Sequence, residues 1–580
     1  MNNSQIADIL EQMGTLIELK EDNAFRARAY HNAARVIQNL SIEVAELQAS
    51  GELTQVSGLG KEMRGHIAEL LSTGTLTFYT ELVASIEPGL IAMLQISGLG
   101  PKRIRTLHEQ LQVTTMEELA TACREGRVAV LSGFGVKTQA NILKGIEFLT
   151  SYASSFSYAP AFEIADAIVT TISRIPGVIR ASVAGSLRRR KEIVHDIDAV
   201  ASVTDDAARD RLMDAFTSLP QAQAVINKGD AKSTIQLPDG LKMDLRVVDN
   251  ADYASVLHHF TGSKEHHIAL RGRALKQGIS INDYGLWRGE DHVPIATEAE
   301  IYATFGMDYI EPELREDRGE IEAAIQHTLP QLITKEDIQG VLHCHTTYSD
   351  GHATLREMAE ACIVRGYTYL GICDHSQVAA YAHGLTPADV RRQHVEIDAL
   401  NAEYGSRLRI LKGTECDILK DGTLDFDNET LASFEFVVAS IHSVFTLSEA
   451  EQTARLIRAI ENPYVTIMGH LTGRLLLQRE GYAVDIPAVI RAAAARGVAI
   501  ELNANPARFD LDWRWHRLAT EQGVYIPICP DAHATNGLDD IQFGVGIARK
   551  GWLTPQQVPN AWQLAQLLQW FATVRKTGKK

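Results

Sequence analysis

Cysteine is scarce in this sequence of 580 residues, and no two cysteines form a Cys-x-x-Cys pair. This scarcity argues against a disulfide framework and against a cysteine-rich zinc site. We expect the six cysteines to be small buried residues in a reducing compartment. They are Cys123, Cys344, Cys362, Cys373, Cys416 and Cys529.

Long apolar runs are also missing. No run approaches the ~20 residues that a membrane helix requires. The opening segment does not resemble a signal peptide, because acidic residues interrupt it at Asp8, Glu11, Glu18 and Glu21. These absences predict a soluble cytoplasmic protein with no membrane partner. The length predicts several domains, and a hydrophobic content of 45% is enough for their cores.

Positive charge is in deficit, since the formal net charge is −17. A chain of this charge does not bind nucleic acid over its whole surface. Any such contact must use backbone N–H groups and local basic patches. The candidate patches are Lys102, Arg103 and Arg105; Arg188 to Lys191; and Arg271, Arg273 and Lys276.

What the first 150 residues do contain is a repeated turn. After two predicted amphipathic helices over 5–50, the pattern apolar-Ser-Gly-apolar-Gly occurs three times, each time before a predicted helix. A single Gly-x-Gly turn is usually a helix connector, but three copies with the same flanks indicate helix-hairpin-helix units that bind DNA backbone without sequence preference. Their N–H groups would receive one phosphate each. The glycines are Gly58, Gly60, Gly98, Gly100, Gly133 and Gly135.

The densest chemical signal before residue 300 runs from Gly185 to Asp198. Asp196 and Asp198 are two residues apart, so in a strand both face one side. Two adjacent carboxylates repel unless a cation lies between them, and Mg²⁺ suits oxygen ligands. Ser186 and Arg189 are positioned to grip a triphosphate, through a hydroxyl with a free N–H after Gly185 and through a guanidinium.

A third carboxylate, Asp244, lies in the alternating segment 241–248. Three carboxylates that hold two metal ions are typical of nucleotidyl transfer. Asp-x-Asp alone is more often an ordinary exposed strand, but Gly-Ser before it and Asp244 after it favour the catalytic reading.

These residues resemble the palm of family X DNA polymerases. A second match, from His259 to His267 and around Asn282-Asp283-Tyr284, resembles the thumb of the same family. The resemblance implies that Phe260 and Gly262 line the deoxyribose, that His267 lies near the base and that Arg271 contacts the template side. It also implies Mg²⁺ or Mn²⁺, dNTPs and primer-template or gapped DNA.

Two departures from that family stand out. The family usually has Gly before the first Asp, where this chain has Val194 and His195. The N-terminal region resembles the family's lyase domain, but His66 replaces the lysine that forms the Schiff base. We therefore expect this domain to hold the downstream end of a gap without lyase activity.

A second group of candidate catalytic residues begins after residue 342. Half of the 20 histidines lie in this part of the sequence. Six histidines and three carboxylates recur where apolar, strand-like runs end. Between them lie predicted helical stretches such as 354–365, 387–404, 449–461 and 487–496. Nine N and O ligands at strand ends predict a barrel whose site holds two or three divalent ions and activates water against a phosphate ester. They are His343, His345, Asp350, His375, Glu415, His442, His470, Asp531 and His533.

This pattern resembles the PHP (polymerase and histidinol phosphatase) domain, with its His-x-His and Asp-x-His motifs. The resemblance implies that each of the nine residues is a ligand, of Mn²⁺ or Zn²⁺, and that Arg474 and the segment Glu501–Arg508 face the phosphate.

Together the resemblances imply a multidomain α/β fold: a helix-hairpin-helix region, an α+β nucleotidyltransferase palm with a small thumb, and a distorted (β/α)7 PHP barrel. Residues 151–160 are predicted to be a linker. The expected domains are 1–80 lyase-like, 81–150 duplex-binding fingers, 151–250 palm, 251–318 thumb, 319–338 linker and 339–580 PHP.

The function expected from this order is gap filling in DNA repair by a monomeric family X polymerase whose PHP domain digests 3′ ends. By resemblance, that nuclease would also cut abasic sites or remove 3′-phosphates. One alternative is a PHP phosphoesterase whose polymerase half is only a DNA clamp, which His195 and the acidic surface favour. The other is a small-molecule nucleotidyltransferase fused to a phosphatase, against which the three hairpins and the Thr-Gly-Ser turn argue.

Overall fold

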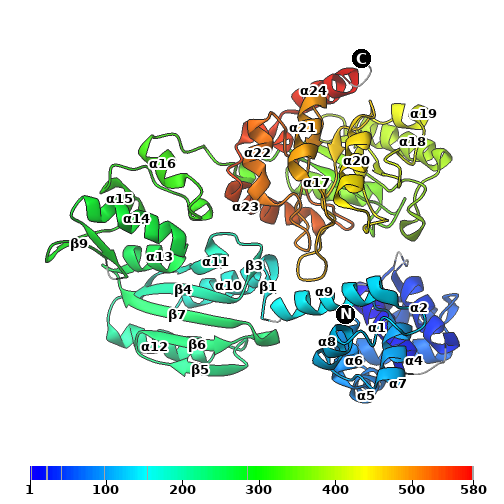
Figure 1. Cartoon of the computed structure of the whole chain (residues 1–580), viewed down its shortest axis with the longest axis horizontal. Coiled ribbons are helices and arrows are strands. Elements are labelled where there is room, and N and C mark those ends of the chain that lie inside the picture. The colour runs from blue at the N-terminus through cyan, green and yellow to red at the C-terminus, as the bar shows by residue number, and fades with distance from the viewer. Residues whose placement is uncertain are drawn as a thin grey trace. The chain divides into compact units, whose positions relative to one another are not determined.

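The computed structural model describes residues 1, 3–20, 24–38, 40, 42–96, 98–152, 154–283 and 285–577. Two residues of the sequence motifs, Ser97 and Tyr284, lie outside this set. The chain divides into two compact units, Met1–Ala153 and Ser154–Lys580 (Figure 1).

The first unit is helical, with one hydrophobic core. Three helices rather than the expected two cover the first 50 residues, because Val44 and Leu47 are buried one turn apart and form a short helix of their own. The helices are α1 (Asn3–Lys20), α2 (Ala24–Gln38), α3 (Val44–Ser50), α4 (Lys61–Thr73), α5 (Thr77–Ala84), α6 (Pro88–Met93), α7 (Pro101–Leu111), α8 (Met116–Arg124) and α9 (Gly135–Ser151).

The three glycine turns have the geometry that their sequence predicts. The first glycine of each turn, at positions 58, 98 and 133, has a positive φ between 79° and 90°, which favours glycine. The apolar residues between the glycines, Leu59, Leu99 and Phe134, are buried. Helices α4, α7 and α9 follow these turns directly, so their N-termini lie beside the glycine N–H groups.

The second unit begins with a five-stranded sheet in the order β2-β4-β7-β6-β5. Strands β4 and β7 pair in parallel, and the other neighbours are antiparallel. Two further short strands, β1 and β3, pair beside it. The elements are β1 (Phe156–Ser157), α10 (Tyr158–Ile172), β2 (Val178–Val183), α11 (Gly185–Arg188), β3 (Ile193–Val194), β4 (Asp196–Val203), α12 (Asp206–Thr217), β5 (Ala224–Lys228), β6 (Lys232–Gln236) and β7 (Lys242–Asp249).

The two faces of this sheet carry different residues. In β4, Ile197, Ala199 and Ala201 are buried in the core that α10 and α12 share. Val200 lies on the other face, in a small cluster with residues of the next helix, α13 (Tyr253–Thr261). Strand alternation places Asp196 and Asp198 on that second face. The carboxylates and the end of α13 are therefore on the same side of the sheet.

A smaller subdomain follows, built around its own core. Its elements are α13, α14 (Lys264–Lys276), β8 (Ser280–Asn282), β9 (Gly285–Arg288), β10 (Asp291–Val293), α15 (Glu298–Ala303) and α16 (Glu320–Ile325).

The division between the two units, after residue 153, falls within the first predicted linker, but described residues of both predicted linkers form secondary structure. Within 151–160, Phe156 starts a strand and Tyr158 is fully buried, because its ring packs against Phe162 of α10 and against Phe509 and Phe543 much later in the chain. Within 319–338, helix α16 forms and Ile321 and Leu332 are buried in the thumb core. In the residues that the structure describes, neither predicted linker is therefore a stretch without secondary structure.

The rest of the second unit is a ring of parallel strands. Pairing runs β11-β12-β13, then β14-β15-β16-β17, then β18-β19, and a bridge between Cys344 and Ala532 returns it to β11. Because β13 continues into β14 and β17 into β18, the described residues 340–577 form seven strand positions. The strands are β11 (Gly340–Cys344), β12 (Tyr369–Ile372), β13 (Arg409–Lys412), β14 (Glu415–Asp417), β15 (Val438–Ser440), β16 (Ile467–Met468), β17 (Ala499–Ile500), β18 (Leu502–Asn503) and β19 (Ile528–Cys529).

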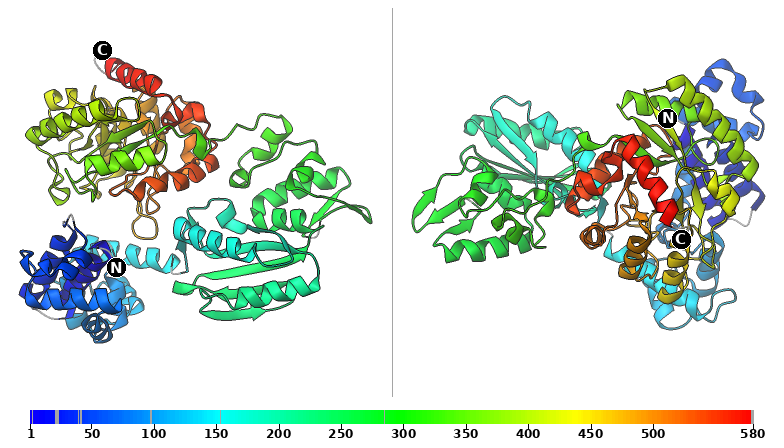
Figure 2. Two further views of the ribbon diagram at one scale, coloured as in Figure 1. Left: turned by 180° about the vertical axis from the view of Figure 1, so that it is seen from behind. Right: turned by 90° about the horizontal axis from the view of Figure 1, so that it is seen from above.

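Helices surround these strands, as the two views of Figure 2 show. The strands read as continuous apolar runs because they are buried on both faces. The helices are α17 (Leu355–Val364), α18 (Pro387–Tyr404), α19 (Asn428–Ala432), α20 (Glu449–Ile460), α21 (Ile486–Arg496), α22 (His516–Glu521), α23 (Ile541–Lys550) and α24 (Leu564–Thr577).

The six cysteines are buried and free, as expected from their spacing. Among the described residues, no helix has both the length and the apolar character to cross a membrane.

Candidate active sites

The first site lies on the palm sheet, where the predicted carboxylates meet. The register of β4 and β7 places Asp198 directly beside Asp244, with Asp196 two residues before Asp198 on the same face. Ile197 is fully buried on the opposite face, as alternation requires. The sequence-based prediction that Asp244 comes from a neighbouring strand is therefore correct in its geometry.

This cluster of carboxylates carries excess negative charge. Burial, with Asp196 and Asp244 close by, raises the pKa of Asp198 to about 6. Asp244 is held in place by Lys232, whose Nζ lies 2.5 Å from Asp244 Oδ2, and by Thr234, whose hydroxyl donates to Oδ1 at 2.6 Å. A raised pKa from neighbouring carboxylates is the state that a divalent cation relieves. The three aspartates fit such an ion.

The glycine that precedes this cluster is required by a close approach. A Cβ at Gly185 would lie 2.2 Å from Asp198 Oδ2, and Gly185 has a φ of +62°. It opens the single helical turn α11, so Ser186 lies in a first turn, whose N–H groups have no partner within the helix. Gly185 thus lets the backbone lie against the carboxylate of Asp198.

We expect Gly185→Ala to lower nucleotide incorporation by at least about tenfold, because the new methyl group displaces Asp198 and the φ is strained. Gly272→Ala is the matched control, since a Cβ added to this helical glycine would have nothing within 4 Å. Steady-state primer extension measures both variants. Equal activity of Gly185→Ala and the wild type would show that Asp198 has room to move without consequence.

The end of α13 supplies the apolar side of this site. Phe260 is half-buried, and the guanidinium carbon of Arg246 lies 3.9 Å from its ring centroid. Arg246 is on the same face of β7 as Asp244, which brings Phe260 toward the carboxylates. Arg271 has a buried Nε with no hydrogen-bond partner in the described part of the chain. An orphaned guanidinium nitrogen fits a ligand contact.

The imidazole of His267 makes a hydrogen bond within the protein and is not a free side chain in the site. Its Nε2 lies 2.9 Å from the carbonyl oxygen of His259, and the two rings stack with centroids 5.4 Å apart. Burial lowers the pKa of His267 to about 4, so the ring is neutral. Any contact of His267 with a base is therefore that of an uncharged ring.

The structure gives Arg189 a different environment from the one that the sequence suggests. Its side chain is buried; Nη1 donates to the carbonyl oxygen of Thr261, and Nε lies 3.1 Å from Glu316 Oε1. The neighbouring Arg188 pairs with Glu298 at 2.5 Å. Neither guanidinium is a free basic patch for DNA, because each is held by the thumb. Arg189 fixes the Thr261–Gly262 turn instead of reaching outward to a triphosphate.

His195 lies outside the carboxylate cluster. Its Nδ1 is 3.2 Å from the Ser154 carbonyl oxygen and from the Ser155 hydroxyl. Val194, the other departure from the polymerase pattern, is fully buried in the core. The side chains at these two positions are therefore occupied by contacts with the protein.

The second site lies at the carboxyl ends of the barrel strands, where the nine predicted ligands meet. The strand β11 carries an irregularity between Val341 and Cys344, and His343 has a left-handed φ of +61°. Strand alternation predicts that His343 and His345 point to the same side of a regular strand. Both rings do approach the same carboxylates, Glu415 and Asp531, but they do so from an irregular strand with a left-handed residue.

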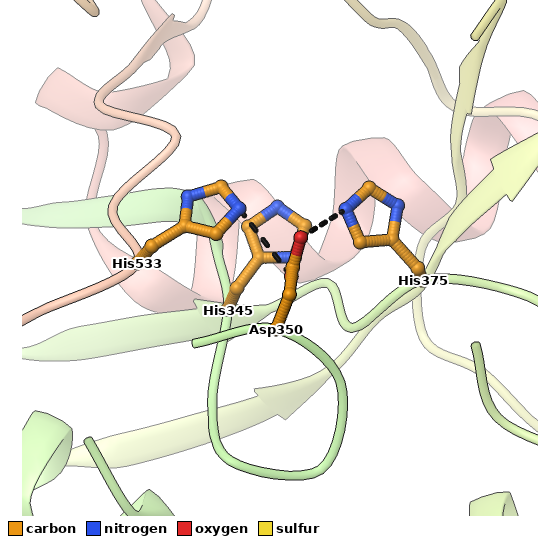
Figure 3. A group of neighbouring side chains, drawn as sticks. All are labelled: His345, Asp350, His375 and His533. Atoms are coloured by element: carbon orange, nitrogen blue, oxygen red, sulfur yellow. Dashed lines mark ion pairs between the residues drawn. The ribbon is translucent and has the colours of Figure 1, made fainter. Parts of the chain in front are cut away.

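Four of the ligands form one group, shown in Figure 3. Asp350 lies between His375, at 3.5 Å, and His533, at 3.4 Å, and His345 Nδ1 lies 3.8 Å from its carboxylate. Each residue comes from a different strand end or loop. Their ligand atoms all lie within 4.8 Å of one another, which is the convergence that a metal site needs.

The other ligands surround Glu415, which is almost fully buried. His470 Nε2 lies 3.0 Å and His442 Nε2 3.2 Å from Oε1. His343 approaches the same oxygen at 3.4 Å. Two groups built on Glu415 have ligand atoms close enough for one ion each, and Asp531 Oδ1 lies 3.2 Å from His345.

The donor set fits divalent cations. Buried nitrogen atoms of His343, His345, His375 and His470 and one oxygen of Glu415 have no hydrogen-bond partner in the described part of the chain. Burial also lowers the pKa of His345 to about 3, whereas, in spite of burial, Glu415 raises the pKa of His442 to about 10 and Asp350 raises the pKa of His533 to about 9. Metal binding at the latter two rings would displace their protons. Buried unpaired donors that converge on carboxylates are otherwise too costly to keep.

Several residues that orient these ligands were missed or misplaced by sequence reasoning. Glu501, expected on a phosphate-facing surface, is fully buried and accepts a hydrogen bond from His343 Nδ1 at 2.7 Å. Asp417 pairs with His442 Nδ1 at 2.8 Å, and Asn503 donates to Asp531 at 3.0 Å. Carboxylates behind metal-binding histidines fix ring orientation. Asp417 is two residues after Glu415, a signal that strand alternation could have used.

The two arginines of the predicted phosphate-facing surface, Arg474 and Arg508, lie in different environments. Arg474 donates to the carbonyl oxygens of Arg508 and Phe509 and pairs with Asp512 at 2.6 Å. It therefore supports the segment that carries Arg508. Arg508 Nε lies 3.7 Å from Asp531 Oδ2, so its guanidinium is at the edge of the ligand cluster.

Comparison with known families covers most of the domains. A helix-hairpin-helix domain matches residues 1–76, and a SAM-like helix-hairpin-helix tandem matches 90–147. The DNA polymerase beta thumb matches 256–316, and the PHP domain matches 342–505.

Individual relatives agree with this division. The chain is 40% identical to the DNA polymerase/3′-5′ exonuclease PolX of Bacillus subtilis over 565 residues. This match covers 97% of this chain and 98% of the relative. Shorter matches are to probable phosphatases. One from a Thermoanaerobacter species is 29% identical over 38% of this chain and 90% of its own length. One from Caldanaerobacter subterraneus is 32% identical over a match that covers 33% of this chain and 76% of the relative.

Proposed function

The chain belongs to the family X DNA polymerases that carry a PHP domain and is a polymerase with PHP nuclease activity, and from this premise we propose which residues do the work. In our proposal, Asp196, Asp198 and Asp244 are the polymerase site, and the nine ligands around Glu415 are the nuclease. The observation that carries it is that each set converges, one on the palm sheet and one at the strand ends of the barrel.

In the palm, Asp196 and Asp198 would hold both metal ions, and Asp244 would orient the 3′-hydroxyl of the primer. Mg²⁺ or Mn²⁺ bound there would supply positive charge to stabilise the phosphoryl transfer. Lys232 holds Asp244 in position at the site through its 2.5 Å contact.

The incoming dNTP lies between the two turns that meet at Arg189. Ser186 and the N–H groups of its turn receive the triphosphate, while Phe260 and Gly262 line the sugar. Arg271, with its orphaned Nε, contacts the template side.

In the barrel, Asp350, Glu415 and Asp531 with the six histidines would hold two or three ions, which we propose to be Mn²⁺ or Zn²⁺. Such ions would supply the activation of water for phosphodiester hydrolysis. Glu501 and Asp417 keep His343 and His442 oriented. Arg508 binds the phosphate beside Asp531.

The DNA substrate we propose is a short gap. Three hairpins present glycine N–H groups at helix N-termini, which suits backbone phosphates in spite of the net charge of −17. Beside the first hairpin, a cavity of about 760 Å³ is lined by Arg28, Arg35 and Lys61. This cavity suits the downstream end of the gap. We propose that the protein acts as a monomer in the cytoplasm, with dNTPs as its small-molecule substrates.

Removing the metal ions should stop both reactions. We expect chelation with excess EDTA to abolish primer extension and 3′ digestion, since both carboxylate-rich sites then repel phosphate. Returning Mg²⁺ should restore extension, and Mn²⁺ should restore both activities. A gel assay on gapped DNA measures the products. Digestion that persists through chelation and dialysis would contradict the nuclease assignment.

A further inference from the structure

The PHP domain sends one charged side chain into the support of the nucleotide site. Lys550, the last residue of α23, has an exposed fraction of 0%. Its Nζ lies 2.5 Å from Glu316 Oε1 and donates to the carbonyl oxygen of Arg189 at 3.0 Å. The indole of Trp513 covers it, with the Nζ 4.5 Å from the ring centroid. A buried ammonium is kept only where its partners are fixed.

The partners of Lys550 lead directly to the two turns of the polymerase site. Glu316 Oε1 also accepts from Arg189 Nε at 3.1 Å, so one carboxylate oxygen serves both cations. Arg189 in turn donates to the Thr261 carbonyl oxygen. A Cβ at Gly262 would lie 2.9 Å from Arg189 Nη1, which shows how closely the turn rests on the guanidinium.

Removal of the Lys550 ammonium would remove two contacts that hold Arg189 and Glu316 in place. Lys550 shares Glu316 with the Arg189 guanidinium and also fixes the carbonyl oxygen of Arg189, so it holds both the side chain and the backbone of that residue. Arg189 immediately follows α11, which carries Ser186. Displacing Arg189 therefore shifts both the Ser186 turn and the Gly262 turn, because its backbone belongs to one and its side chain holds the other.

We propose that Lys550 of the PHP domain is a positioning residue for nucleotide binding by the polymerase domain, acting through Glu316 and Arg189. It does not touch the substrate. The inference rests on the proposed function, in which the Gly262 turn and the Ser186 turn bind the dNTP. It goes beyond that function by making the PHP domain part of the polymerase's nucleotide site, independently of nuclease chemistry.

The test uses the full-length protein on a one-nucleotide-gapped duplex. We expect Lys550→Met to raise the KM for the dNTP about tenfold while kcat changes little, because a misplaced turn weakens binding before it affects the carboxylates. Digestion of a 3′ end without dNTP should match the wild type, since Lys550 is not among the nine ligands. Glu316→Gln, which keeps the shape but removes the charge, should raise KM in the same direction.

The matched control is Arg549→Met. Arg549 precedes Lys550 on α23 and pairs with Glu313 at 2.8 Å, so it joins the same two domains without touching Arg189. Its KM should equal that of the wild type. An equal rise in KM for Arg549→Met would mean that general loosening of the domains, not the Lys550 contact, sets KM, and would overturn the proposal. Unchanged KM in both Lys550→Met and Glu316→Gln would overturn it too.

Phe260→Ala separates this inference from the function on which it rests. If Phe260→Ala raises the KM and Lys550→Met does not, only the role of Lys550 is wrong. If Phe260→Ala leaves the KM unchanged, the assignment of the nucleotide turn itself is wrong. Should Lys550→Met lose nuclease activity and melt early, Glu316→Gln decides the outcome alone.

Discussion

Asp244→Ala is expected to lower nucleotide incorporation by about 10³-fold, the scale of removing a preorganised charged group from a reacting centre. Asp244 lies beside Asp198 in the register of β4 and β7, and Lys232 and Thr234 hold its two oxygens. Its loss leaves the primer 3′-hydroxyl without a carboxylate to orient it. Single-nucleotide incorporation on gapped DNA, followed under single-turnover conditions, measures the effect.

Asp249→Ala provides the control for this prediction. Asp249 ends the same strand and pairs with Arg209 at 2.7 Å, and its side chain is 74% exposed. Its removal should leave incorporation unchanged, because surface ion pairs contribute little. Digestion of 3′ ends should survive in both variants. If Asp244→Ala incorporates nucleotides normally, the assignment of the polymerase site to these palm carboxylates is wrong.

The second large effect is expected in the barrel. Glu415→Gln should lower 3′ digestion by more than about 100-fold, because we propose Glu415 as a metal ligand, and even residues behind metal ligands typically account for 10–100-fold. His343, His442 and His470 all lie within 3.4 Å of its Oε1. The amide keeps the volume but replaces one acceptor oxygen with a donor nitrogen and removes the charge. Bound metal per chain, measured by atomic spectroscopy, should fall with the nuclease rate.

Glu403→Gln is the same substitution at an exposed carboxylate of α18, which pairs with Arg356 at 2.7 Å. It should change neither metal content nor digestion. Gap filling by Glu415→Gln should remain at the wild-type level. A nuclease rate that stays high while metal content drops would place the hydrolytic site elsewhere in the chain.

Residue types at strand ends are enough to predict most of the second site. His343, Glu415 and Asp531 each follow an apolar run, and strands buried on both faces leave only their ends for polar ligands. The helices between them are predictable nearly to the residue, since the sequence pattern indicates helices over 387–404 and 449–461, and α18 and α20 span 387–404 and 449–460. Amphipathic spacing and capping residues determine such boundaries locally.

What the sequence does not reveal depends on contacts between distant residues. The position of Arg189 after Gly-Ser suggests a triphosphate contact, but Glu316, 127 residues later, holds its guanidinium. Glu501 is expected on a surface, although His343, 158 residues away, makes it an interior acceptor. The strained φ of His343 also has no local signal, because it is imposed by the strands on either side.

The central claim is that one chain builds and breaks phosphodiester bonds in two separate sites. The most direct test follows a 5′-labelled strand that ends at a one-nucleotide gap, with Mn²⁺, in the wild type, Asp244→Ala and Glu415→Gln. With dNTPs the wild-type strand should grow by one nucleotide, and without them it should shorten. Asp244→Ala should only shorten the strand, and Glu415→Gln should only extend it. Loss of both reactions in either variant, with the protein folded, would contradict the existence of two independent sites.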